Sequence, residues 1–369
     1  MGVGRFVYTP ILPLMHAQAG LSAGAGAHLA TANYVGYLVG ALAGTFLPGA
    51  VRSTAVLRGS LLALVVALAA MPLTHTTAVW LLLRLGAGAL SALIFVIATS
   101  SLLSHLRGQP DHLPGWAFGG VGVGITLSGL LVLALRSAGD WRTAWWASAA
   151  LAAALTLAAW SLRPEPASMT PSNGATAVKA RPRRPRTSRW FSVLLVSYTL
   201  EGVGYIIAGT FLVAAIEQTS PGWIGSGAWV LVGLAAIPSS ALWAGLVRRW
   251  TRPTLLLVAL GVQAVGIVLP ALIEGVAAAL ISAVLFGATF IGVSTLTLGA
   301  GSHLGFPRAV ALLTVGYSVG QILGPLVAAP LLGHGYHQAL ILAAGTVLAA
   351  AFAAFVLRFG FPHRVPTPR

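Results

Sequence analysis

Long apolar runs follow one another along nearly the whole of this 369-residue chain. A run of roughly 18 or more such residues is long enough, as a helix, to cross ~30 Å of hydrocarbon. Only 7% of the residues are charged and 57% are hydrophobic, whereas a soluble domain carries roughly 25% charged residues. The alternating segments of ~10 residues that are typical of a membrane β-barrel do not occur. The sequence therefore predicts an all-α polytopic membrane protein in contact with the lipid bilayer.

The apolar runs form two sets of six. We predict twelve transmembrane helices, at residues 1–18, 27–48, 55–73, 77–103, 115–136, 143–162, 190–215, 226–247, 254–273, 276–300, 308–332 and 338–360. The predicted domains are an N-terminal six-helix half (1–163), a basic cytoplasmic linker (164–189), a C-terminal six-helix half (190–361) and a cytoplasmic tail (362–369).

The two halves begin with similar strings. Residues 2–6 read Gly-Val-Gly-Arg-Phe, and residues 202–206 read Gly-Val-Gly-Tyr-Ile, so a shift of 200 residues superimposes them. A duplicated apolar chain with a polar connection in the middle is typical of secondary transporters. We therefore expect two pseudo-symmetric six-helix bundles.

The basic residues are distributed unevenly along a chain of formal net charge +15. Arg5 and Arg84 fall inside apolar runs, and Arg136 and Arg142 flank the connection between the fifth and sixth runs. All other Lys and Arg residues fall in, or within a few residues of, the connections after the second, fourth, eighth and tenth runs, the linker or the tail. Cytoplasmic connections carry such an excess. We expect a bacterial plasma (inner) membrane protein with both termini cytoplasmic, and no nucleic-acid partner.

Residue types that serve catalysis or metal binding are scarce. The chain has no cysteine, which excludes disulfides and thiolate ligands. The nine histidines lie near the ends of runs or in connections, and none forms a pair at ligand spacing within a helix. The strings GxxxxGK[ST] and HExxH are missing. We expect no cofactor, no metal site and no enzymatic activity, and we exclude transport driven by ATP hydrolysis in this chain.

Glu201 is the one acidic residue well inside an apolar run. An ionised group at that depth costs at least ~2.5–3.5 kcal/mol, so the carboxyl should be paired, hydrated or protonated. A carboxyl that alternates between charged and neutral forms suits proton coupling; the alternative is a structural carboxyl that bonds to a neighbouring helix. Tyr198 and Tyr205 share its predicted helix face, which we expect to line a cavity.

Two arginines are the other deep charges. Arg5, with Tyr8 on the same face, could pair with Glu201, bind an anionic group, or extend to the cytoplasmic surface if Met1 is the true start. Arg84 could polarise a proton site, anchor a substrate or extend to the outer surface. Only four residues precede Arg5, so the first helix lacks a cytoplasmic apolar half. We expect the native chain to begin upstream of Met1.

Polar and small residues recur at four-residue spacing in the predicted helices. Asn33 with Tyr37, and Tyr317 with Gln321, either line a cavity or bond to a neighbouring helix. Glycines at this spacing let helix backbones approach closely. We expect such packing at Gly120, Gly124, Gly316, Gly320 and Gly324.

Several strings resemble the YbfB/YjiJ-like group of the major facilitator superfamily. They are Gly2-x-Gly-Arg-Phe-x-Tyr-Thr-Pro-Ile-Leu-Pro13, Ala32-Asn-Tyr-x-Gly-Tyr37, Leu200-Glu-Gly-x-Gly-Tyr205, Gly320-Gln-Ile-Leu-Gly-Pro325 and the fourth-helix pattern at residues 80–88. The resemblance implies twelve helices in two bundles, alternating access, and a cavity lined by the first, fourth, seventh and tenth helices. Those helices carry Arg5, Arg84, Glu201 and Thr289. The chain departs from the group in lacking apolar sequence before Gly2 and an acid in the second-to-third connection.

Together these observations predict a secondary active transporter that moves a small organic solute by alternating access, coupled to protons and functional as a monomer. Arg5 and Arg84 favour a solute with an anionic group. The alternatives are a sensor or scaffold on the same fold, which has no need of a deep titratable group, and a passive facilitator, which differs only in proton dependence.

Overall fold

The computed structural model describes residues 1–105, 112–135, 139–164, 185–220 and 222–362, and within these ranges it is helical and contains no strand. The α-helices are α1 (Gly2–Phe6), α2 (Tyr8–Ala19), α3 (Ala23–Phe46), α4 (Pro48–Val51), α5 (Thr54–Ala70), α6 (Thr77–His105), α7 (His112–Leu135), α8 (Trp141–Ala158), α9 (Pro185–Thr219), α10 (Ile224–Leu246), α11 (Arg252–Leu272), α12 (Val276–His303), α13 (Ala309–Ala328) and α14 (Tyr336–Arg358). Two 3₁₀ helices, η1 (Met71–Leu73) and η2 (Ala329–His334), follow α5 and α13.

Each predicted apolar run coincides with a helix, but fewer helices than predicted qualify as membrane spans. Within the described residues, nine helices are long and apolar enough to cross a membrane. The first run is divided into α1 and α2, because Pro10 has no N–H to offer the carbonyl of Phe6. α3 contains His28 and Asn33, and α8 begins with Arg142 in its first turn, which lowers the hydropathy of both. Twelve spans therefore remain a prediction.

Several helices begin at residues that bind their own first turn. The side chains of Ser22, Ser53 and Thr251 each accept a hydrogen bond from a backbone N–H three residues on, at the starts of α3, α5 and α11. Such N-caps satisfy donors that have no partner within the helix. At the other end of α2, Gly20 takes the left-handed conformation that ends a helix (φ 66°).

Asp140 caps α8 and gives a pH-dependent contribution to its stability. Its carboxylate accepts hydrogen bonds from the backbone N–H and the hydroxyl of Thr143, both at 2.8 Å, and these bonds lower the pKa of Asp140 below 3.8. A lowered pKa stabilises the fold above the unfolded value, and the effect is lost as pH falls through the folded value. Asp140→Ala should lower the melting temperature by a few degrees at pH 7 and less below pH 3. Asp140→Asn, which keeps the acceptor, should retain most of the stability; equal losses in both variants would contradict a capping role.

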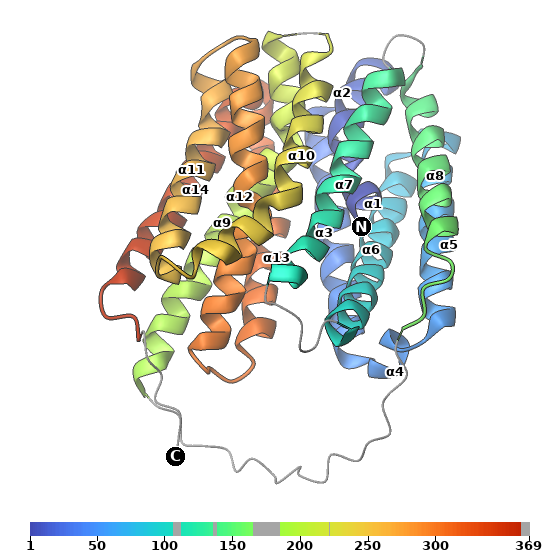
Figure 1. The fold of residues 1–369 in the computed structure, drawn as a ribbon. Coiled ribbons are helices and arrows are strands. Elements are labelled where there is room, and N and C mark those ends of the chain that lie inside the picture. Colours follow the sequence, from blue (N-terminus) through green and yellow to red (C-terminus); the bar gives the residue numbers. More distant parts are fainter. Residues whose placement is uncertain (106–111, 136–138, 165–184, 221, 363–369) are drawn as a thin grey trace.

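Helices from before the linker contact helices from after it, mainly along three pairs. Figure 1 shows the earlier helices on one side and the later ones on the other, with α7 and α10 side by side between them. The most extensive contacts between the two parts are those of α7 with α10, α3 with α13 and α2 with α9, and smaller ones join α3 with η2 and α2 with α10. Within the parts, α3 packs on α6, and α9 packs on α13 and α14.

Glycines allow several of these pairs to approach backbone to backbone. A Cβ added to Gly320 in α13 would overlap the carbonyl oxygen of Thr199 in α9, and one on Gly316 would lie 2.6 Å from Leu195. Gly324 likewise faces α9, and Gly124 in α7 faces the backbone of Gly2. Added atoms at those positions would require the helices to separate.

Two findings differ from the expected glycine packing. A Cβ added to Gly120 meets no atom within 4 Å, so the expectation of close packing there is not met. Conversely, Gly36, Gly40 and Gly44 of α3 lie against α6, a ladder that our sequence analysis overlooked although its four-residue spacing is plain.

Glycines bring the main chains of α7 and α10 close together at several points. Gly119 and Gly122 approach the main chain of Ile237, and Gly129 approaches that of Val230. Gly233 in α10 faces the main chain of Thr126 in return. A larger side chain at any of these four positions would push the two helices apart.

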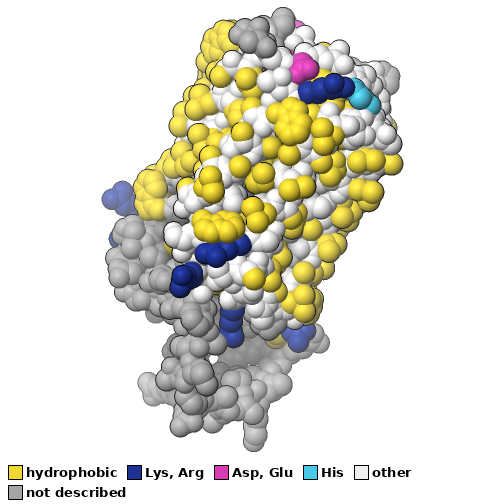
Figure 2. All heavy atoms as spheres, turned by 90° about the vertical axis from the view of Figure 1, so that its right-hand side faces the viewer, with side chains coloured by type: hydrophobic (Ala, Val, Ile, Leu, Met, Phe, Trp, Pro, Cys, Tyr) yellow, Lys and Arg dark blue, Asp and Glu magenta, His cyan; other side chains and the backbone are white. Residues whose placement is uncertain are grey.

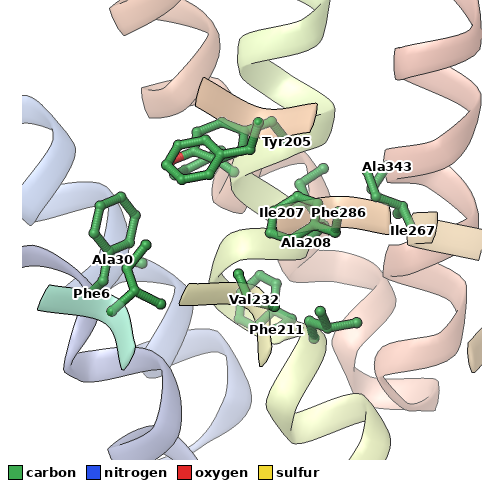
Figure 3. Packing of buried hydrophobic residues seen from close by; sticks show 14 of the residues in the cluster. Phe6, Ala30, Tyr205, Ile207, Ala208, Phe211, Val232, Ile267, Phe286 and Ala343 are labelled. Carbon is green, nitrogen blue, oxygen red and sulfur yellow. The ribbon is translucent and has the colours of Figure 1, made fainter. Parts of the chain in front are cut away.

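The surface and the interior are both apolar. Figure 2 shows hydrophobic side chains over most of one face, with most of the visible basic side chains in its lower half. One hydrophobic cluster extends through helices from both parts of the chain; Figure 3 shows Phe6 and Ala30 from the earlier part and Tyr205, Phe211 and Phe286 from the later part. An apolar exterior over an apolar core suits an integral membrane protein.

Candidate functional site

The charged side chains buried inside the helices belong to two groups of polar residues. The first, which we call the arginine cluster, consists of Arg5, Tyr8, Tyr34, Tyr37 and Arg84, from α1, α2, α3 and α6. The second, which we call the acid pair, consists of Glu201 in α9 and Gln263 in α11.

Arg5 is held in the interior by aromatic rings and one amide. Its guanidinium lies over Tyr37 at 4.3 Å from the ring centre and over Tyr34 at 5.1 Å. Its Nη2 donates a hydrogen bond of 2.6 Å to Gln321 Oε1 in α13. The side chain is only 4% exposed, so it does not extend to a surface.

Arg84 is also enclosed. Its guanidinium lies 4.5 Å from the ring centre of Tyr8, and the hydroxyl of Tyr8 donates to the carbonyl of Gly26 at 2.9 Å. The residue is 1% exposed, and its Nε and Nη1 atoms have no hydrogen-bond partner. Asn33 bonds to a neighbouring helix, because its Nδ2 donates to the carbonyl of Arg84 at 2.8 Å.

Glu201 lies fully buried beside the amide of Gln263, which is also fully buried. No well-formed hydrogen bond joins them, and both carboxyl oxygens of Glu201 are without a partner. Among the described residues no ion pair joins Glu201 to Arg5, whose polar bond goes to Gln321. Sequence reasoning missed Gln263, since nothing in α11 indicates that it meets an acid on α9.

An aromatic stack lies near both the arginine cluster and the acid pair. The ring of Tyr317 in α13 stacks on Tyr198 at 4.4 Å and on Tyr205 at 5.8 Å between centroids, and Tyr205 stacks on Phe290 at 4.9 Å. Tyr205 and Tyr317 are each within electrostatic range of both Arg5 and Glu201. The tyrosines therefore face α12 and α13 while Glu201 turns toward α11. At 100° per residue, position 201 lies about 60° around the helix from Tyr198.

Thr289 takes no part in either group. Its hydroxyl donates to carbonyls of its own helix, Leu285 at 2.8 Å and Phe286 at 3.1 Å, and the residue is 1% exposed. Thr289, the cavity residue predicted for the tenth helix, therefore uses its hydroxyl within its own helix.

Hydrogen bonds also join the two parts of the chain directly. The hydroxyl of Thr9 donates to the carbonyl of Gly209 at 2.6 Å, and the hydroxyls of Tyr34 and Thr210 share a bond of 2.8 Å. The ring nitrogen Nε2 of His16 and the hydroxyl of Tyr336 lie 2.7 Å apart. Sequence analysis found none of these, because each joins residues far apart along the chain.

An apolar cavity of about 640 Å³ lies among α1, α5, α6, α7 and the residues that follow α8. Met1, Leu57, Ile94 and Phe118 are among its lining residues, and Gly120 opens onto it. None of its lining residues belongs to the arginine cluster or the acid pair, so the cavity is not the polar site.

Long apolar helices that bury arginines and an acid are typical of membrane proteins whose interior holds a functional site. The family model described as "Uncharacterised MFS-type transporter YbfB" matches residues 1–356. The chain belongs to this family, and the resemblance seen in the sequence is confirmed.

Solved structures of another transporter share the fold. A crystal structure of a point mutant of the nucleoside transporter NupG has a TM-score of 0.72 at 14% identity, covering 96% of this chain and 97% of that one. A second NupG structure has a TM-score of 0.66 at 14% identity, covering 97% and 98%. At this identity the likeness concerns the fold alone. A search of curated proteins gives no match.

Proposed function

We propose that this protein is a secondary active transporter that moves a small organic solute across the plasma membrane, coupled to protons through Glu201. In this proposal the helices form two six-helix halves that expose the site to either side in turn. The family and the NupG-like fold support a transporter.

The burial of Glu201 is the observation that carries proton coupling. The residue is 0% exposed, lies within a long apolar helix and has no cationic partner among the described residues. A permanently charged carboxylate there would cost several kcal/mol. A scaffold gains nothing from such a group, whereas a carboxyl that takes up and releases a proton as the site opens can couple solute movement to a proton gradient.

The aromatic stack supports communication between proton and solute. Tyr205 and Tyr317 are each within electrostatic range of both Glu201 and Arg5, and Gln321 connects Arg5 to the same helix as Tyr317. A change of charge at Glu201 would therefore alter the electrostatic environment of the arginine cluster across these packed rings.

A solute screen in proteoliposomes tests the function. Purified protein should accumulate at least one small organic solute when a pH gradient is imposed, and collapse of the gradient should abolish accumulation. Uptake that only equilibrates, whatever the gradient, would instead identify a passive facilitator. Absence of transport across a broad panel would favour a sensor or scaffold.

The proposed topology can be tested with single cysteines, because the native chain has none. In intact cells a membrane-impermeant maleimide should label Thr76→Cys, in the connection before α6, but neither Arg52→Cys, after α4, nor Ser172→Cys, in the linker. Opening the membrane should make the last two reactive. Labelling of Ser172→Cys from outside would overturn the cytoplasmic assignment of the linker.

A further inference from the structure

Two buried guanidinium groups share one region without an acid to balance them. Arg5 and Arg84 are close enough for their charges to repel each other, and they are 4% and 1% exposed. Among the described residues neither forms an ion pair, and Glu201 lies instead beside Gln263. The arginine cluster therefore holds two like charges in a medium of low dielectric constant, where their mutual repulsion is stronger than in water.

Donors of both arginines are unused. Arg5 Nε, Arg84 Nε and Arg84 Nη1 are buried and have no hydrogen-bond partner. Buried polar groups are normally paired, and a guanidinium cannot shed its proton to escape the penalty. The unused N–H groups belong to rigid forks whose shape matches a carboxylate.

The rings of the cluster satisfy only part of this demand. Tyr8, Tyr34 and Tyr37 offer their faces to the two guanidiniums, which is a weaker attraction than that of an anion. The same rings provide flat, largely apolar walls beside the charges. The neighbourhood is therefore suited to a molecule that is anionic at one end and apolar along its body.

We propose that Arg5 and Arg84 together bind the carboxylate of a small organic acid whose apolar or aromatic body lies against the tyrosines of the arginine cluster. The assignment rests on the proposed function, because it names the class of solute that is moved. Arg5 also contacts Gln321 of α13. A carboxylate that replaces this amide would therefore change a contact between the two parts of the chain.

Thermal unfolding of the purified wild-type protein tests the site without any gradient. The probes are benzoate, phenylacetate and butyrate, each compared with its primary amide, and inorganic phosphate. At least one carboxylate should raise the melting temperature in a saturable way, as a ligand of the folded state does, while its amide and phosphate should not. Equal effects of acid and amide, no effect of any acid, or an equal effect of phosphate would each overturn the proposal.

Variants locate the binding. Arg5→Gln and Arg84→Gln should each weaken binding of the active carboxylate at least tenfold, and Arg84→Lys should bind with intermediate affinity because it keeps the charge but loses the fork. Arg142→Gln is the matched control, since Arg142 lies over Trp141 but is exposed; it should bind as the wild type does. Wild-type affinity in folded Arg84→Gln would refute the site.

The outcomes separate the two proposals. If a carboxylate binds through these arginines but is not transported, the proposed site is supported and the proposed transport function is rejected. A protein that accumulates neutral solutes and ignores every carboxylate would keep the transport function and reject the site.

Discussion

Replacing Glu201 with glutamine is expected to abolish solute accumulation driven by a pH gradient, lowering the coupled rate more than tenfold. Glutamine has nearly the same size and fits the same fully buried space beside Gln263, but it cannot take up or release a proton. Exchange of solute across membranes without a gradient should survive, since it needs alternating access but no net proton movement. Parallel assays of gradient-driven uptake and of exchange in proteoliposomes measure both.

Glu217→Gln is the matched control for this experiment. It makes the same change in the same helix, but near the end of α9, where the residue is partly exposed. Coupled uptake should persist in this variant. If Glu201→Gln accumulates solute at the wild-type rate, the carboxyl is structural and the coupling mechanism is wrong.

Replacing Gly88 with alanine is expected to separate α6 from α3 and to destabilise the protein markedly. The added Cβ would overlap the carbonyl oxygen of Asn33 and lie 2.9 Å from its carbonyl carbon. Overpacking of this kind typically costs about 1–3 kcal/mol. Backbone cannot yield as a side-chain tip can, so we expect a fall of several degrees in the melting temperature in detergent, together with lower expression.

Gly120→Ala provides the comparison, because an atom added there meets nothing within 4 Å. It should match or slightly exceed the wild-type melting temperature, since alanine restricts the unfolded chain. A Gly88→Ala protein as stable as Gly120→Ala would show that α3 and α6 can move apart at little cost.

The membrane class and the helix positions could be read from the sequence because both depend on local composition. Runs of apolar residues define where helices lie whatever their neighbours are, and a deep charge such as Glu201 stands out against them. The family signature around Arg5 is equally local.

The partners of these residues could not be read in the same way. Gln263 meets Glu201, and Gln321 meets Arg5, only because of how α11 and α13 are rotated about their axes. One helix also cannot reveal what its glycines face: Gly124 lies against Gly2, while Gly120, one turn earlier, faces open space. Residues four apart are rotated by about 40°, enough to move a glycine out of a contact.

The main-chain contact between α7 and α10 has a mechanical consequence. Gly119, Gly122, Gly129 and Gly233 have no side chains of their own at this contact, so rotation of one helix against the other meets less steric resistance there than it would with larger residues. We therefore expect α7 and α10 to rotate against each other more readily than they separate. When the two halves expose the site to either side in turn, as proposed, they would rotate about this helix pair. The hydrogen bonds from Thr9 and His16 would break and form again as they do so.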